Sequence, residues 1–246
     1  MGVKKEKEQL IQYFKDRSSF TTDDLLAFFS QSQKDIKRAT VNWRIYELVR
    51  QGILNRTGRG VFSIGKEQVF SCKVQKKQKS VSSLIKNKLP LIKFCCWHTS
   101  VLKEFYHHIA KNDFLIVDVE RDAVDSVFFL LKDTNKNIFK EPSPNIIENY
   151  VYARKEAIIA KALLSESPLQ SAEGVPVPSL EKILVDLYAD SNLFFFLQGN
   201  ELVNIFRNAF EKYTINRDKL MRYAKRRNKE KIIQSTINQI NGNNLI

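Results

Sequence analysis

Basic and amide side chains gather at the start of a helical segment that the sequence predicts over Ile36–Gln51. Val41, Ile45 and Leu48 recur at helical spacing, so one face of this segment must be buried while the opposite face is exposed. Arginine pairs with guanine and asparagine with adenine, whereas lysine and threonine more often hold phosphates. The predicted contacts of this segment with double-stranded DNA are Lys37, Arg38, Thr40, Asn42, Trp43 and Arg44. We expect the two arginines and the asparagine to read bases, and the alternative for the tryptophan is a position partly in the core.

Two short strand-like runs follow this segment, Ile53–Arg56 and Val61–Ile64. Two glycines in the connection Thr57–Gly60 favour a tight hairpin. An arginine on a hairpin can enter a minor groove or hold a phosphate, and the alternative is a solvated turn. The predicted DNA contacts of the hairpin and its edge are Arg56, Arg59 and Lys66.

Metal ligands and carboxylates in the middle of the chain lack the spacing of a known catalytic motif. Cys95–His98 and His107-His108 are close in sequence, but successive strand residues point to opposite faces and no CxxC or HExxH spacing occurs. Asp118 and Glu120 are able to share a strand face, as nuclease carboxylates that hold Mg²⁺ do, although a solvated strand end is the favoured reading. We therefore expect no metal site, no cofactor and no catalytic residue.

A second basic segment is predicted near the C-terminal end, where Leu220, Tyr223 and Ala224 form an apolar stripe on a helix. Such a helix binds nucleic acid, an acidic protein or a membrane surface, or it packs on its own domain with an incidental basic face. The basic residues of most interest in it are Arg217, Arg222, Lys225, Arg226 and Arg227.

The elements that must position the first basic segment follow a recognisable order. Helical spacing of apolar residues predicts helices over Lys4–Lys15 and Asp23–Ser30 before the one over Ile36–Gln51. Thr21 and the acidic residues after it make a good helix start, and Gly52 is suited to end the third helix in a left-handed conformation. Three helices followed by a hairpin is the order of a winged helix-turn-helix.

The remainder of the chain alternates between strand and helix patterns and ends in helices. The predicted strands are Leu89–Trp97, Phe114–Val119 and Ser126–Leu131, and the predicted helices are Ser100–Lys111, Leu180–Leu187 and two or three between Glu201 and Ile240, broken near Tyr213–Asn216. This mixture indicates a mixed α/β domain. The predicted fold class is thus α+β, with an N-terminal winged helix, a mixed α/β domain and a helical C-terminus.

Length and charge divide the chain in the same way. Its 246 residues exceed a typical single core, so we expect a DNA-binding domain over 1–70, a basic linker over 71–80 and a second domain over 81–246. Residues 1–80 hold 17 Lys and Arg against 8 Asp and Glu, residues 81–205 hold 13 against 16, and residues 206–246 hold 10 against 3. Basic ends of this kind attract polyanions, and we expect residues 1–80 to fold and bind DNA alone.

Composition excludes several classes of protein. Hydrophobic residues make up 43% and aromatic residues 11%, which is too much apolar material for a disordered chain. No apolar run reaches membrane-spanning length, and the first residues lack the apolar stretch of a signal peptide. The three cysteines, Cys72, Cys95 and Cys96, do not form a disulfide framework. We expect a cytoplasmic protein that does not associate with a membrane.

Three segments resemble the AbiEi-type antitoxins, which are bacterial regulators of phage-defence loci. "YELVRQGILNRTGRGVFSIG" is similar to that family's helix, glycine and "GrGvY" wing, with Phe62 in place of tyrosine. "VPVPSLEKILVDLYAD" at Val175–Asp190 is similar to its "v-s-P-E-K/R-t-L-l-D-l" segment, with two residues between Pro178 and Glu181. "INRDKLMRYAKRRNKEKIIQSTI" at Ile215–Ile237 is similar to a terminal segment "d-L-l-x-Y-A-x-r".

This resemblance implies a repressor that binds operator DNA and belongs to a toxin-antitoxin system, with a nucleotidyltransferase-like toxin as partner. The basic segment around Arg222 would then be a possible antitoxin surface. One alternative is a nucleic-acid-processing enzyme, a nuclease or nucleotidyltransferase that a winged helix delivers to DNA. Another is an interaction adaptor whose winged helix contacts no DNA.

Overall fold

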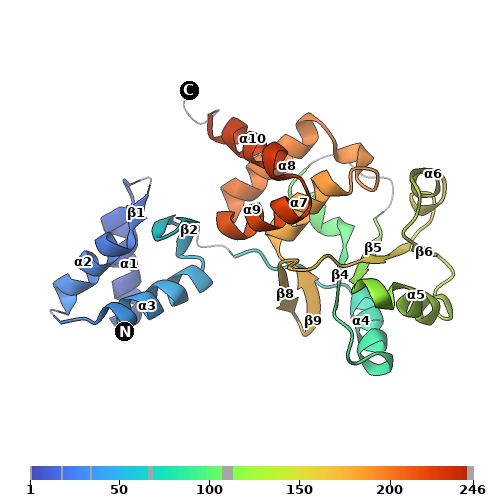
Figure 1. Cartoon of the computed structure of the whole chain (residues 1–246), viewed down its shortest axis with the longest axis horizontal. Helices are drawn as coiled ribbons and strands as arrows, with labels where there is room; N and C mark the ends of the chain where they lie inside the picture. Colours follow the sequence, from blue (N-terminus) through green and yellow to red (C-terminus); the bar gives the residue numbers. More distant parts are fainter. Residues whose placement is uncertain (1, 18, 34, 66–68, 107–112, 243–246) are drawn as a thin grey trace. The chain divides into compact units, whose positions relative to one another are not determined.

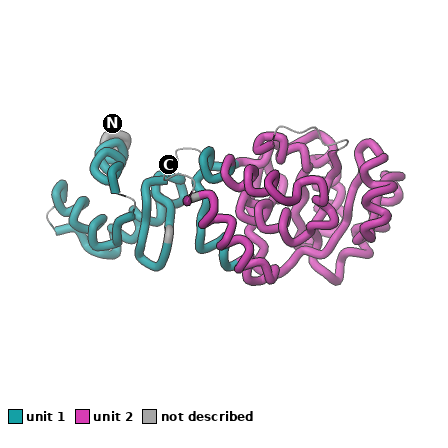
Figure 2. Tube along the Cα trace, turned by 90° about the horizontal axis from the view of Figure 1, so that it is seen from above, with its two compact units in different colours: residues 1–70, 209–222 teal, residues 71–208, 223–246 magenta. Residues whose placement is uncertain are grey.

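The computed structural model describes residues 2–17, 19–33, 35–65, 69–106 and 113–242. It divides into two compact units, which Figure 2 distinguishes by colour. Unit 1 combines Met1–Phe70 with Ala209–Arg222, and unit 2 combines Ser71–Asn208 with Tyr223–Ile246. Both units contain helices and strands, as the α+β prediction requires.

Three helices form most of unit 1: α1 (Gly2–Phe14), α2 (Thr22–Ser32) and α3 (Arg38–Arg50). They confirm the three helices predicted from apolar spacing. Their apolar residues form one core, which includes Leu10, Phe14, Leu25, Phe29, Val41, Ile45 and Leu48.

Thr21 begins α2 with a complete capping box. Its hydroxyl accepts from the Asp24 amide at 3.2 Å, and the Asp24 carboxylate accepts from the Thr21 amide at 2.7 Å. Two amides that the first helical turn leaves without partners are thereby satisfied. The sequence-based helix start was therefore correct.

A small antiparallel sheet completes unit 1, with strand order β1 (Phe20–Thr21), β3 (Val61–Ile64), β2 (Leu54–Gly58). Gly52 lies at φ 74° after α3, as predicted, and the amide after it bonds back to the Leu48 carbonyl at 3.0 Å. Gly65 packs so closely on Gly52 that an added Cβ would lie 2.0 Å from the Gly52 carbonyl oxygen. Backbone contact between these glycines closes the base of the hairpin.

Residues 209–222, the second segment of unit 1, pack on the base of the β2–β3 hairpin. The Thr214 hydroxyl donates to the Gly52 carbonyl at 3.1 Å, and the Phe70 and Tyr213 rings meet edge to face at 5.3 Å. Residues 209–222 therefore belong with the N-terminal residues, which differs from the expected partition into 1–70 and 81–246.

Unit 2 is built on a four-stranded sheet in the order β4 (Phe94–His98), β5 (Leu115–Val119), β7 (Ile158–Ala162), β6 (Ile138–Lys140). Strand β4 runs antiparallel to β5, and the other pairs are parallel. A separate hairpin joins β8 (Leu169–Ala172) to β9 (Val175–Pro178). The predicted strands over 89–97 and 114–119 correspond to β4 and β5.

Helices cover both faces of this sheet. Helices α4 (Lys76–Lys88) and α5 (Val124–Lys132) pack on one face, whereas α7 (Leu180–Ala189) lies on the other (Figure 1). The C-terminal helices are α8 (Asn200–Lys212), α9 (Arg217–Arg226) and α10 (Glu230–Gly242). The break between α8 and α9 confirms the interruption predicted near residues 213–216. The shorter helical turns are η1 (Thr99–Glu104), η2 (Arg121–Ala123), α6 (Pro144–Ile146), η3 (Ile147–Val151) and η4 (Phe195–Leu197).

Two predicted elements of unit 2 were wrong in type or length. The strand predicted over Ser126–Leu131 is part of α5, because Val124, Val127 and Leu131 are buried at spacings of three and four. A short apolar run gives little periodicity, so it does not distinguish a strand from a helix. The helix predicted over 100–111 is the 3₁₀ helix η1, and residues 107–112 lie outside the described residues.

The segment expected to be a linker over 71–80 is part of unit 2. Helix α4 begins at Lys76, and the fully buried Gln78 side chain donates to the Cys96 carbonyl at 2.8 Å. This amide packs under the sheet, although the lysines around it suggested a solvated connection. In the part of the chain that the structure describes, no helix is long and apolar enough to cross a membrane.

Candidate functional site

The outer face of α3 is polar and aromatic. Val41, Ile45 and Leu48 are buried, while the predicted DNA contacts Lys37, Arg38, Thr40, Asn42 and Trp43 are exposed. Trp43 is 64% exposed, which contradicts the alternative of a position partly in the core, and Tyr46 one turn later is equally exposed. Large aromatic side chains on a polar helix face are typical of a surface that meets a partner.

The two arginines of this helix differ in their surroundings. Arg38 forms a solvent-exposed ion pair with Asp23 at 3.0 Å, which contributes little stability and is readily exchanged for another anion. Arg44 contacts Glu6 at 2.9 Å, with its guanidinium over the Phe29 ring. Arg44 thus joins α3 to α1 and α2, which differs from its expected role as an exposed base reader.

The hairpin lies beside this helix face. A cavity of about 290 Å³ is lined by Asn42 and Tyr46 of α3 together with Arg56 of β2, so the structure brings two predicted contact sets together. Arg56 lies over the Phe62 ring, and Arg59 is exposed at the hairpin tip. Lys66, the remaining predicted contact, lies outside the described residues.

The second predicted basic surface is less uniform than its sequence. Arg217 and Arg222 belong to unit 1, whereas Lys225, Arg226 and Arg227 belong to unit 2. Arg222 and Lys225 are exposed, and Arg226 bonds to the Ser165 hydroxyl. The Arg227 side chain is only 15% exposed and pairs with Asp190 at 2.6 Å. Arg227 therefore forms its ion pair within unit 2. In unit 1, the Arg217 guanidinium lies over the Phe210 ring.

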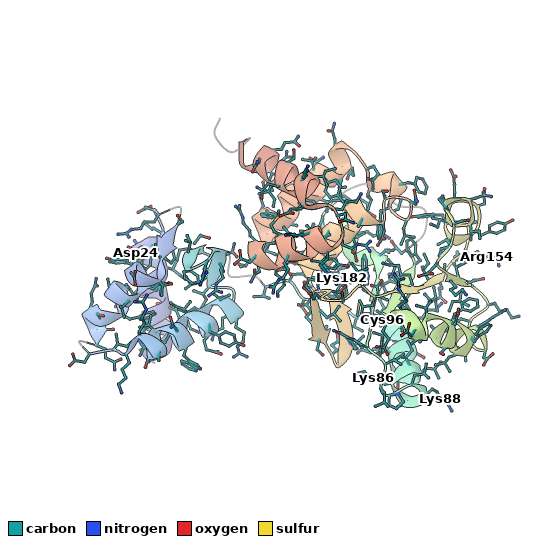
Figure 3. All side chains as sticks on the ribbon, viewed as in Figure 1. Asp24, Lys86, Lys88, Cys96, Arg154 and Lys182 are labelled. Atoms are coloured by element: carbon teal, nitrogen blue, oxygen red, sulfur yellow. The ribbon has the colours of Figure 1, made fainter. Side chains whose placement is uncertain are left out.

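An ion cluster that the sequence analysis missed occupies the interior of unit 2. Asp118 is fully buried and contacts Lys161 and Lys182, each at 2.8 Å. Lys182 lies inside the unit (Figure 3) and also contacts Asp186 at 2.5 Å. The members of this ion cluster are Asp118, Lys161, Lys182, Asp186, Asp190 and Arg227.

The register of the sheet explains why these residues meet. Cys95 is paired with Asp118, and Asp118 with Lys161, so their side chains share the face under α7. The Cys95 thiol contacts the Asp118 carboxylate at 3.6 Å, whereas the Cys96 thiol points to the Gln78 carbonyl beneath the sheet. The expectation that the two cysteines point to opposite faces is confirmed. On α7, Lys182 and Asp186 are one turn apart and complete the cluster.

Ion pairing sets the charge states of the cluster. Burial by itself would raise the pKa of Asp118, but attraction and hydrogen bonding from Lys161 and Lys182 hold this pKa below its usual value. Burial would likewise lower the pKa of Lys161, and the neighbouring aspartates raise it instead. In the ion cluster three carboxylates thus face three basic side chains. The favoured prediction of a solvated strand end at Asp118 was wrong, because Asp118 is fully buried.

The described residues offer little for metal or acid–base chemistry. Both Asp118 oxygens contact lysines and Glu120 is exposed beyond the strand, so the two do not form a carboxylate pair. No group of three or more His, Cys, Asp or Glu able to hold a metal ion is found within the described ranges. His98 contacts Gln75 and Ser100, and burial lowers its pKa. His107 and His108 lie outside the described residues.

Comparison with known proteins places the chain in one family. A search of curated protein sequences finds no match. The model of a family of unknown function, DUF6577, matches residues 40–243, which include most of α3, the hairpin and nearly all of unit 2. The chain therefore belongs to the DUF6577 family.

Proposed function

We propose that unit 1 is a winged-helix module that binds double-stranded DNA, with α3 as the recognition helix and the β2–β3 hairpin as the wing, and that the protein is a transcriptional repressor. The observation that carries the proposal is the exposed face of α3, which presents Arg38, Asn42 and Trp43 next to the arginines of the hairpin. A helix of this length fits a major groove, and its N-terminal residues reach base edges in this type of docking.

Charge supports the same assignment. Unit 1 holds 17 Lys and Arg against 10 Asp and Glu, and this excess favours phosphate contacts, which are sequence-independent and weaken with salt. Asn42 is suited to read adenine in a bidentate manner, and Trp43 and Tyr46 offer apolar contacts to thymine methyl groups or sugars. Arg59 at the hairpin tip is suited to hold a phosphate or enter a minor groove.

The test is selection of preferred sequences from a random duplex library by the full chain, followed by affinity measurements on the selected site and on random DNA. Asn42→Ala should weaken binding to the selected site by about 1–3 kcal/mol and leave random DNA nearly unaffected. Arg59→Ala should weaken binding to both. Arg50→Ala, in the last turn of α3 and paired with Glu47, is the matched control and should change neither.

Absence of binding at low salt would overturn the proposal, as would equal losses on selected and random DNA for Asn42→Ala. DNA affinity that falls as the salt concentration rises would speak against the alternative of an adaptor whose winged helix contacts no DNA.

We also propose an antitoxin role for unit 2, which rests on the resemblance of Val175–Asp190 and Ile215–Ile237 to AbiEi-type antitoxins. One observation favours it: the two segments contact each other, since Arg227 pairs with Asp186 and Asp190 and the Tyr223 hydroxyl donates to Asp186 at 2.9 Å. The part of the second segment from Tyr223 onward thus packs against the first segment within unit 2.

Co-expression with the product of the neighbouring gene tests this role, with growth as the readout. Charge reversal should involve Arg222, Lys225 and Arg226, because reversal of Arg227 would break the ion cluster and confound the result. A folded triple-Glu variant that still restores growth would remove this basic surface from neutralisation. Failure of the full chain to restore growth would remove the antitoxin role.

A further inference from the structure

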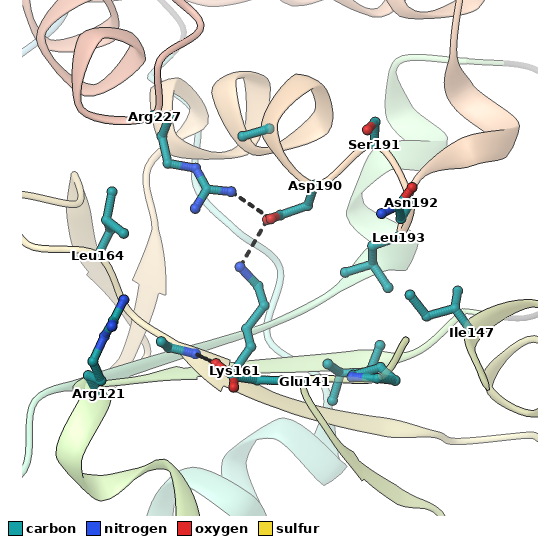
Figure 4. Close-up of a pocket in the computed structure, with 14 residues that line it drawn as sticks. Arg121, Glu141, Ile147, Lys161, Leu164, Asp190, Ser191, Asn192, Leu193 and Arg227 are labelled. Atoms are coloured by element: carbon teal, nitrogen blue, oxygen red, sulfur yellow. Dashed lines mark hydrogen bonds and ion pairs between the residues drawn. The ribbon is translucent and has the colours of Figure 1, made fainter. Parts of the chain in front are cut away.

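A cavity of about 360 Å³ lies in unit 2 where Lys161, Asp190 and Arg227 of the ion cluster reach the surface (Figure 4). Its volume is within the range of small-molecule sites. Ile147, Leu164 and Leu193 contribute apolar wall, and the polar groups come from strand β7, the turn after α7 and the residue after α9. The cavity therefore combines an apolar wall with converging charges.

The carboxylates of the cavity already have donors. Asp190 accepts from Arg227 on one oxygen at 2.6 Å and from Lys161 on the other at 3.0 Å. Glu141 accepts from the Ala162 amide at 3.2 Å. A cationic ligand would have to compete with these contacts, so the carboxylates do not favour a cation.

The cations of the cavity have donors to spare. An ammonium has three N–H donors, and Lys161 meets two acceptors among the described residues, Asp118 and Asp190. Arg121 lines the same cavity from η2 and forms no hydrogen bond or ion pair with a described residue. The side chains of Lys161 and Arg227 line the cavity and are each 15% exposed.

Charge balance points in the same direction. Three basic side chains line the cavity, Arg121, Lys161 and Arg227, against the two carboxylates Asp190 and Glu141. From these observations we infer that the cavity binds a small organic anion, with a carboxylate or phosphate group held by Arg121 and Lys161 and an apolar body against Ile147 and Leu193. Both anionic groups suit this arrangement, because each accepts several charge-assisted hydrogen bonds.

Calorimetric titration of the full chain with three probes of similar shape tests the site: phenyl phosphate, benzoate and the neutral benzamide. At least one anion should bind with a dissociation constant of about 1 mM or tighter, and benzamide should bind roughly tenfold more weakly or not at all. The tighter anion identifies the preferred head group. Binding of benzamide as tight as that of the tighter anion, or no saturable binding of either anion, would overturn the proposal.

Arg121→Gln should weaken binding of the preferred anion roughly tenfold and leave benzamide unaffected. The side chain is exposed and lies outside the ion cluster, so the variant is expected to fold, which circular dichroism checks. Arg154→Gln is the matched control, since this exposed arginine contacts Asn137 and does not line the cavity. Unchanged anion binding in Arg121→Gln would also overturn the proposal. Because no DNA is present, these outcomes are independent of the proposed repressor function.

Discussion

Single residues in the interior of unit 2 show how charge is tolerated in an apolar core. Asp118 and Lys182 are almost completely removed from water, and each is compensated by two partners of opposite sign. Sequence reasoning found Asp118 but assigned it to solvent, because its partners lie 43 and 64 positions further along the chain. Only the register of β5 with β7 and the placement of α7 bring them together.

Neutralising one member of the ion cluster should leave its buried partners without a counter-charge and destabilise unit 2. Asp118→Asn leaves three cations facing two carboxylates, and loss of a buried partner typically costs about 3–5 kcal/mol. We expect the free energy of unfolding of unit 2 to fall by that amount in urea titrations. Asp125→Asn breaks the exposed pair with Lys140, at 2.6 Å, and should cost less than about 1 kcal/mol. Similar losses in the two variants would contradict the role assigned to the ion cluster.

Asp118 also affects how the stability of unit 2 changes at acidic pH. The pKa values of Asp118 and Asp190 in the folded protein are below the ordinary value of 3.8, because cations outweigh burial. A lowered pKa contributes stability that is fully present above the unfolded value and is lost as pH falls through the folded value. The midpoint temperature of thermal unfolding of unit 2 should therefore stay nearly constant down to about pH 4 and decrease at lower pH. Asp118→Asn should show a shallower decline in the same scans, and an identical decline would contradict this assignment.

At the level of helices and strands, prediction succeeded where local chemistry decides the structure. The capping box at Thr21, the left-handed Gly52 and the apolar stripes of α1 to α3 are all encoded within a few neighbouring residues. It failed where tertiary packing decides. The apolar run over 126–131 had no clear period, and the lysines of α4 concealed the buried Gln78. Among the described candidate DNA contacts, exposure was predicted correctly except for Arg44, whose inward placement depends on Glu6 in another helix.

Close packing at the base of the hairpin gives a second stability prediction. In Gly65→Ala the new Cβ would lie 2.0 Å from the Gly52 carbonyl oxygen, so the backbone must shift. We expect unit 1 to lose about 1–3 kcal/mol, as in other overpacked sites. In Gly58→Ala the nearest atom is 3.8 Å away, and the change should be below about 1 kcal/mol. Thermal unfolding of both variants measures the difference, and equal midpoints would rule out close packing as the reason for Gly65.

In the whole molecule, the compact units are not continuous stretches of the chain, since unit 1 combines residues 1–70 with residues 209–222. Residues 1–80, which we expect to fold alone, lack the contacts with Tyr213 and Thr214 when they are produced without residues 209–222, so the importance of these contacts can be measured. A fusion of 1–70 to 209–222 through a flexible linker should unfold at a higher temperature than 1–70. A fusion with the same fourteen residues (209–222) in scrambled order is the control, and should not. Equal midpoints for the three fragments would show that residues 209–222 do not stabilise unit 1.

This discontinuity also has a consequence for synthesis. When Phe70 has been added to the growing polypeptide, roughly 140 further residues must be translated before Ala209 is available, which takes on the order of 10 s at usual elongation rates. During that interval the base of the hairpin is without its Thr214 partner, and the nascent N-terminal part lacks the last segment of its own unit. Its maturation therefore waits for the ribosome to pass through nearly all of unit 2.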